Sequence, residues 1–129
     1  MEKVTGIGGF FFRSKNHSDL NDWYERNLGI RKCPQEYEDG SWWQDEGPTV
    51  FGAEAAQVQF GRPEQTWRIN FRVNDLDAMV SQLRAAGIVV DVETEIYPNG
   101  RFAHLEDPEG NKIELWEAGG TDSVRPKQS

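Results

Sequence analysis

The fold is decided by one stretch near the C-terminus, Asp107-Pro108-Glu109-Gly110-Asn111-Lys112-Ile113-Glu114-Leu115. Its first five residues favour a tight turn, because proline fixes φ, glycine reaches positive φ, and Asp and Asn side chains bond to nearby backbone groups. The segments on either side predict strands over residues 101–105 and 112–117. The stretch therefore predicts two strands joined by a tight connection.

The residues before this stretch predict a strand, a helix and a second strand. Residues 67–73 alternate polar and apolar side chains, as a half-buried strand does. Asp75 is a good N-cap for a helix that Gly87 is placed to end. The apolar stripe of this helix consists of Leu76, Met79, Val80 and Leu83. Residues 89–93 are β-branched, and Asn99-Gly100 is a turn signal, so this half has the order βαβββ.

The first half of the chain shows the same order of elements. Residues 7–13 are short, apolar and aromatic, which predicts a strand. Several caps for a helix lie within residues 16–19, and Gly29 is placed to end it. The apolar face of this helix consists of Leu20, Trp23, Tyr24 and Leu28. Turn signals separate three further strand candidates, at residues 32–37, 41–45 and 49–53.

This recurrence predicts an internal duplication. The pair Phe12-Arg13 recurs as Phe71-Arg72, and the order strand, helix, glycine stop and meander recurs about 60 residues later. We expect one domain of two modules, the first at about residues 4–60 and the second at about residues 66–118. Residues 119–129 are expected to be a loose tail.

Charge and composition exclude several classes of function. The 129 residues carry a net charge of −8, which opposes binding to nucleic acid and to anionic membranes. No apolar run approaches the roughly 20 residues of a membrane span. Cys33 is the only cysteine, and the N-terminus lacks the apolar stretch of a signal peptide. We therefore expect a soluble cytoplasmic protein.

Several of these segments resemble one known group of proteins, the vicinal oxygen chelate superfamily of glyoxalases, bleomycin-resistance proteins and extradiol dioxygenases. The segments that carry the resemblance are Arg13-Ser14-Lys15-Asn16, Trp23-Tyr24, Leu28-Gly29, residues 71–77 and, most specifically, residues 107–115. The resemblance implies an α+β fold in which two βαβββ modules form a curled mixed sheet around a cleft. It also implies a homodimer, and a divalent metal and small oxygen-bearing substrates in many members.

The resemblance places the metal ligands at four positions, on the first and last strand of each module. In this chain those positions are Gly9, Phe51, Arg68 and Glu114, of which only Glu114 is a ligand type. A shift of register would add Glu54 at most. His17 and His104 fall on none of these positions. We therefore expect no cofactor, and a divalent metal is possible but disfavoured.

Alternation along the strands predicts which side chains face the cleft. Glu114 and Trp116 share one face of the last strand, and Arg68, Asn70 and Arg72 share the matching face of the strand at residues 67–73. Phe11 and Arg13 face the cleft from the first strand on the same reasoning. Arg68 and Glu114 are expected either to form an ion pair that replaces the metal or to point separately to solvent.

Further candidates lie on the meanders. Either face is possible for His104, which is a candidate acid or base if it points inward and a structural residue if it does not. Trp42 and Trp43 are adjacent, so one of them should face the cleft and stack on a ligand. Tyr97 and Arg101 flank a turn and are expected to rim the opening.

Three functions remain open from the sequence. The first is a metal-independent protein that binds a small molecule in a cleft lined by aromatic and arginine side chains. The second is a metal-dependent lyase, isomerase or dioxygenase of the glyoxalase kind, with Glu114 as a base or a single ligand. The third is a structural or regulatory protein, because one fold hosts many functions.

Overall fold

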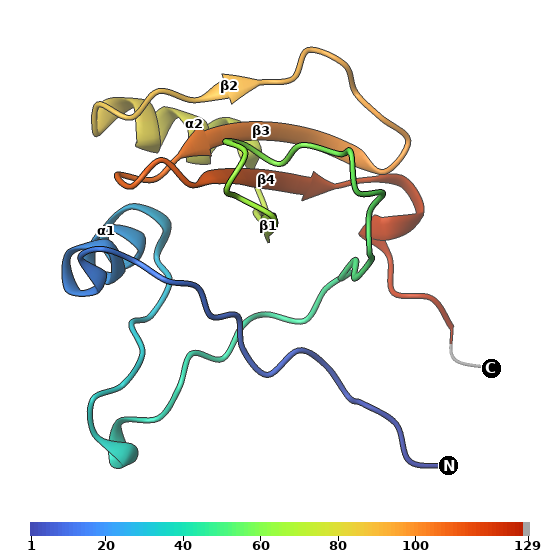
Figure 1. Ribbon diagram of the computed structural model, residues 1–129. Coiled ribbons are helices and arrows are strands. Elements are labelled where there is room, and N and C mark those ends of the chain that lie inside the picture. The colour runs from blue at the N-terminus through green and yellow to red at the C-terminus, as the bar shows by residue number, and fades with distance from the viewer. Residues whose placement is uncertain (128–129) are drawn as a thin grey trace.

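A four-stranded mixed sheet forms in the second half of the chain (Figure 1). The computed structural model describes residues 1–127. The strands are β1 (Ile69–Arg72), β2 (Asp91–Val92), β3 (Gly100–Glu106) and β4 (Lys112–Ala118), in the spatial order β1-β4-β3-β2. β1 runs parallel to β4, and the other two pairs are antiparallel. All four strands lie at the predicted positions, with bounds that differ by a residue or two.

The two helices begin and end where the capping signals predicted. α1 (His17–Leu28) is capped by Asn16, whose side chain accepts from the Asp19 N–H, and ends at Gly29 with φ of 71°. α2 (Leu76–Ala85) is capped by Asp75, whose side chain accepts from the Ala78 N–H. Such caps satisfy N–H groups that have no partner within the helix.

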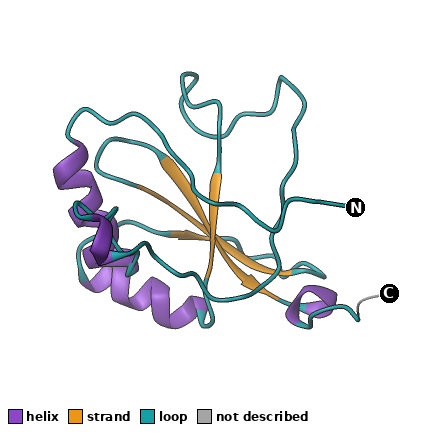
Figure 2. Cartoon of the chain, turned by 90° about the horizontal axis from the view of Figure 1, so that it is seen from below, coloured by secondary structure: helices purple, strands orange, loops and turns teal. Residues whose placement is uncertain are grey.

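The hydrophobic core lies between the helices and one face of the sheet. Leu76 and Leu83 of α2 are fully buried, as are Ile113 and Leu115 of β4. The apolar stripe of α1 joins the same core. Figure 2 shows α1 and α2 gathered on one side of the strands. The opposite face of the sheet, here called the helix-free face, therefore carries the alternate residues of each strand.

The turn that decides the fold also holds α1 against the sheet, through Asp107. This carboxylate is 4% exposed and accepts hydrogen bonds from the Tyr24 hydroxyl at 2.7 Å and from the Asn111 side-chain amide at 2.7 Å. It also accepts from the backbone N–H groups of Glu109 and Asn111. Burial, with this hydrogen bond, raises the pKa of Tyr24 far above its usual range. Asp107 therefore joins the tight turn to the first half of the chain.

Glu109 makes a second connection from the same turn. Its carboxylate accepts from the Ser14 hydroxyl at 2.6 Å and from the backbone N–H groups of Lys15 and Asn16. These hydrogen bonds, that of Ser14 first, lower the pKa of Glu109. The segment that leads into α1 is therefore fixed to the second half by an ionised side chain.

The prediction of strands in the first half is wrong for this chain. None of the described residues before β1 belongs to a strand. No β pairing forms in the four segments predicted as strands there, which are residues 7–13, 32–37, 41–45 and 49–53. Much of their apolar surface is exposed, including Phe51 at 89%. An alternating or apolar pattern predicts an extended backbone, but a strand also needs a partner for its N–H and C=O groups. The α+β class is confirmed, and the strands of the sheet in the described residues all come from the second module.

Smaller elements complete the described chain. A short 3₁₀ helix, η1 (Tyr37–Asp39), lies in the first half. A second one, η2 (Gly120–Ser123), lies in the tail that was expected to be loose, and residues 128–129 of that tail lie outside the described range. Neither α1 nor α2 has the length and apolar composition to cross a bilayer. Cys33 is a free, exposed thiol, and a cytoplasmic location stays a prediction.

Candidate functional site

The strand register gathers polar side chains at the centre of the helix-free face. Because Ile113 and Leu115 point into the core, Glu114 between them points to the opposite side. Asn70 on β1 and His104 on β3 stand directly opposite Glu114, one on each side. Three adjacent strands thus present an amide, a carboxylate and an imidazole in one row.

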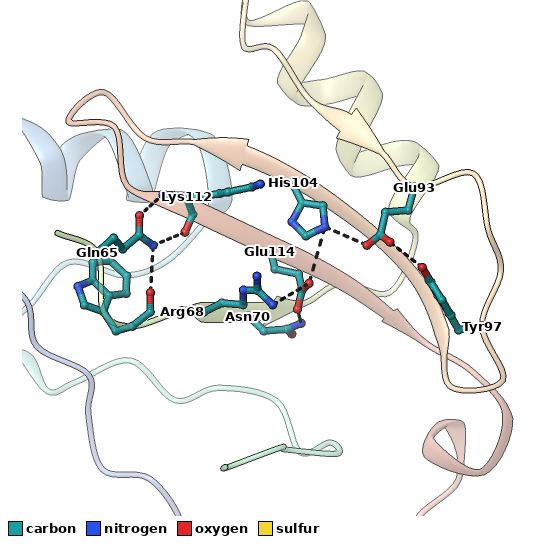
Figure 3. Close-up of polar contacts among 9 residues, drawn as sticks. Gln65, Arg68, Asn70, Glu93, Tyr97, His104, Lys112 and Glu114 are labelled. Carbon is teal, nitrogen blue, oxygen red and sulfur yellow. Dashed lines mark hydrogen bonds and ion pairs between the residues drawn. The ribbon is translucent and has the colours of Figure 1, made fainter. Parts of the chain in front are cut away.

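Glu93, His104 and Glu114 form the centre of this site, here called the Glu-His-Glu cluster. His104 Nε2 lies 2.9 Å from Glu93 Oε2 and 3.7 Å from Glu114 Oε2. One ligand-type atom from each residue lies within 4.8 Å of the others. Figure 3 shows the imidazole between the two carboxylates. His104 therefore faces inward, which was one of the two orientations left open.

Neighbouring side chains satisfy both carboxylates. The Asn70 amide donates to Glu114 Oε1 at 2.7 Å, and the Tyr97 hydroxyl donates to Glu93 Oε1 at 2.9 Å. Arg68 Nη1 lies 3.8 Å from Glu114 Oε2 (Figure 3), so of the two alternatives left open for these residues, the ion pair is present. The Arg68 guanidinium also lies 5.0 Å from the centre of the Phe60 ring. The cluster therefore has a surrounding shell of donors.

The electrostatics of the site favour an ionised Glu93. The hydrogen bond from His104 is the main cause that lowers the pKa of Glu93, and burial opposes it. The hydrogen bond from Tyr97 and the nearby charge of Arg68 act in the same direction as His104. The bond to Glu93 in turn raises the pKa of Tyr97 to about 12. Tyr97 therefore stays a neutral donor at physiological pH.

His104 makes all of its polar contacts through one nitrogen. Its side chain is 19% exposed, and Nε2 contacts both carboxylates. Nδ1 is buried and has no hydrogen-bond partner among the described residues. An imidazole held in this way can exchange a proton with a carboxylate or bind a cation through Nε2.

Three other predicted residues have different surroundings from those expected. Arg72 lies on the helix-free face and donates to the Asp45 carbonyl at 3.0 Å. Arg101 does not rim an opening: it shares a strand face with the core residue Ala103 and pairs with Asp77 of α2 at 3.0 Å. Trp116 shares the face of Glu114 but is 3% exposed, and its indole N–H donates to the Asn99 carbonyl. Trp116 therefore presents little surface to a ligand in this chain.

The predicted site residues of the first half are not part of the cluster. Phe11 is 90% exposed and Trp43 is 92% exposed, because their segments have no sheet to pack on. Arg13 and Trp42 are exposed as well. The structure therefore brings together only the candidates that belong to the second half.

Glu93 is the site residue that the sequence analysis missed. It follows β2, and its backbone N–H donates to the Phe102 carbonyl, which places its side chain on the same face as His104. The signal was present in the alternation of residues 89–93, but the long connection to β3 left the register between the two strands undefined.

The metal positions that the resemblance implied do not fit a metal. Gly9 and Phe51 have no ligand atom in their side chains and lie in the first half, which contains no strand among its described residues. Arg68 places a permanent cation beside Glu114. Three of the four positions that the resemblance implied therefore offer no side-chain ligand atom for a metal.

Comparisons with known proteins agree with this fold. TnmS3, an antibiotic binding protein from Streptomyces sp. CB03234, has 22% identity and a TM-score of 0.63, over 92% of this chain and 100% of its own. Lactoylglutathione lyase from Agrobacterium tumefaciens has 17% identity and a TM-score of 0.56, over 89% and 95%. A search of curated proteins found no match. The profile of the glyoxalase-like domain matches residues 9–116. The chain therefore belongs to the glyoxalase-like domain family.

Proposed function

We propose that this protein binds a small molecule on the helix-free face of its sheet. The observation that carries the proposal is the connected row of polar groups at the centre of that face, from Arg68 and Asn70 through Glu114 and His104 to Glu93. A sheet face without helices is often polar because it is solvated, but here His104 and Glu114 are only 19% and 15% exposed. Removing such ionisable groups from water costs free energy, which a purely structural face would not require. Few, well-placed polar groups are typical of ligand sites.

Aromatic side chains near this row support an aromatic, oxygen-bearing ligand. Phe102 shares the face of His104 on β3, and its ring centre lies 5.7 Å from that of Tyr97 and 6.1 Å from that of Trp116. Trp42 and Trp43 are available on the exposed segment of the first half. TnmS3 is an antibiotic binding protein, which supports a small-molecule ligand for this chain.

A homodimer is part of this proposal. The first half exposes large apolar side chains that water does not favour, among them Phe11, Trp43, Val50 and Phe51. β1 and β2 are the two edges of the sheet. A second copy of the chain supplies both a strand partner and an apolar surface. Sedimentation velocity should give twice the mass of one chain, and a monomer at high concentration would contradict the dimer.

The binding proposal is tested by titrating the protein with 8-anilinonaphthalene-1-sulfonate and with a panel of planar aromatic antibiotics. Tryptophan fluorescence measures the affinity for each compound. Arg72→Ala should weaken binding of the anionic probe about tenfold, because a hydrogen bond to a charged group contributes about 1.5 kcal/mol or more. Arg26→Ala removes the same charge from the last turn of α1 and is the matched control. Equal affinities of the two variants would contradict a site on the helix-free face.

An enzyme is the second candidate, and the position of His104 favours it. An imidazole held by Glu93 beside Glu114 is an arrangement suited to general acid–base catalysis. The same experiment separates the two functions when the bound compound is recovered and analysed by mass spectrometry. Unchanged compound supports a binding protein. Conversion that Glu114→Gln abolishes supports a lyase, isomerase or dioxygenase.

A further inference from the structure

We propose that Glu93, His104 and Glu114 bind a divalent transition-metal ion within the second half of the chain. An ion such as Zn²⁺ holds nitrogen and oxygen ligands at about 2.0–2.2 Å, so neighbouring ligand atoms lie about 3–3.5 Å apart. His104 Nε2 stands 2.9 Å and 3.7 Å from the two carboxylate oxygens, which brackets that separation. The ligand atoms of the two carboxylates lie within 4.8 Å of each other.

The donor set defines which ions fit. One imidazole and two carboxylates suit Zn²⁺, Co²⁺, Ni²⁺ and Mn²⁺ better than the soft ion Cu⁺. His104 and Glu114 project from paired positions of β3 and β4, and Glu93 follows β2. Ligands on neighbouring strands are held by the sheet rather than by a loop, so the ordering cost of binding is small. Glu114 and His104 are 15% and 19% exposed, which leaves access for the ion.

This site differs from the one that the family resemblance implied. It uses Glu114 but takes its other two ligands from Glu93 and His104, which lie on no family ligand position. All three residues come from one module, so the site needs neither a second module nor a second chain. The inference is independent of the proposed ligand, because its test uses the metal ion alone.

Two features of the site limit its affinity. Arg68 lies 3.8 Å from Glu114 and repels a second cation. His104 Nδ1 must carry the proton when Nε2 binds an ion, and that N–H has no acceptor among residues 1–127. Loss of a group that hydrogen-bonds to a metal ligand typically lowers the affinity for the metal about 10–100-fold. We therefore expect weaker binding than in closed structural zinc sites, with Ni²⁺ and Zn²⁺ bound more tightly than Mn²⁺.

The site is tested by calorimetric titration of the full chain, purified with chelator, with Zn²⁺ alone. Wild-type protein should bind one ion per chain. Glu93→Gln, His104→Gln and Glu114→Gln should each weaken binding by more than about tenfold, because each removes a ligand. His17→Gln and Glu106→Gln are the matched controls: His17 is the other histidine and Glu106 is an exposed glutamate of β3. Both controls should bind as the wild type does.

Electron paramagnetic resonance of the Cu²⁺-loaded wild type provides a second readout that needs no variant. Coupling of the copper to one imidazole nitrogen is the expected result. Circular dichroism without metal establishes that each variant is folded. Absence of Zn²⁺ binding, a copper spectrum without nitrogen coupling, or binding that survives His104→Gln would each overturn the proposal. Loss of binding in His17→Gln would overturn it too, since the ion would then lie on the surface of α1.

Discussion

Replacement of Asp107 by alanine should lower the free energy of unfolding by about 3–4 kcal/mol. Its buried carboxylate accepts hydrogen bonds from Tyr24, from the Asn111 side chain and from two backbone N–H groups of the tight turn. Alanine leaves these donors without a partner, and an unsatisfied buried polar group costs about 1–3 kcal/mol. Water can reach the edge of the turn, so the costs do not add in full.

Urea denaturation followed by tryptophan fluorescence measures this change. Asp91→Ala is the matched control, because Asp91 is an exposed aspartate of β2, and its effect should stay within about 0.5 kcal/mol. Tyr24→Phe removes one donor only and should cost about 1 kcal/mol. A loss below about 1 kcal/mol in Asp107→Ala would show that the turn does not anchor α1.

The second half of the chain was predictable because its local signals agree with its tertiary packing. Asp75 caps α2, and the apolar stripe from Leu76 to Leu83 faces the buried side of β4. Alternation along β4 also placed Glu114 on the opposite face, and the ion pair with Arg68 is one of the two arrangements that this placement allowed. Where propensity, capping and alternation all indicate one structure, sequence reasoning is reliable.

The first half was predicted only in part, because an extended segment becomes a strand only when another strand pairs with it. The local sequence does not specify that partner. Asn16 and Gly29 define α1 by local hydrogen bonds, and these were found. The segments that contain Phe11, Trp43 and Phe51 are apolar enough for strands, but no pattern in them predicts which strand they would pair with. A second copy of the chain is the partner that we propose for these segments.

Two errors at the site have the same cause, which is the unknown register between strands. Arg101 was expected at the rim, but it shares a strand face with Ala103 of the core and so points to α2. Glu93 was overlooked, although its pairing with Phe102 places it beside His104. A shift by one residue exchanges the two faces of a strand, so faces are certain only where the register is known.

Arg68 links the ion pair of the described chain to the proposed metal site. Its guanidinium balances the charge of Glu114, as a bound metal ion would, and repulsion between the two cations weakens metal binding. The residue occupies the position at which the family resemblance expects a ligand. Affinity for metal should therefore respond to Arg68 more strongly than to any other residue outside the Glu-His-Glu cluster.

Arg68→His should tighten Zn²⁺ binding about 100-fold relative to the wild type. The substitution removes a permanent cation and adds an imidazole to the three existing ligands, and four nitrogen and oxygen ligands complete the tetrahedral shell that Zn²⁺ favours. Arg68→Met removes the charge without adding a ligand, so it should account for about tenfold of the change. Calorimetric titration of the three proteins under one buffer measures both steps.

The double variant Arg68→His with His104→Gln separates the new ligand from the old one. It should lose most of the gain, because the added imidazole then only replaces His104 rather than completing a set of four. If Arg68→His and Arg68→Met bind Zn²⁺ equally, position 68 does not reach the ion. If neither variant binds more tightly than the wild type, Arg68 does not compete with a metal at Glu114, and the affinity limit that we assign to it is wrong.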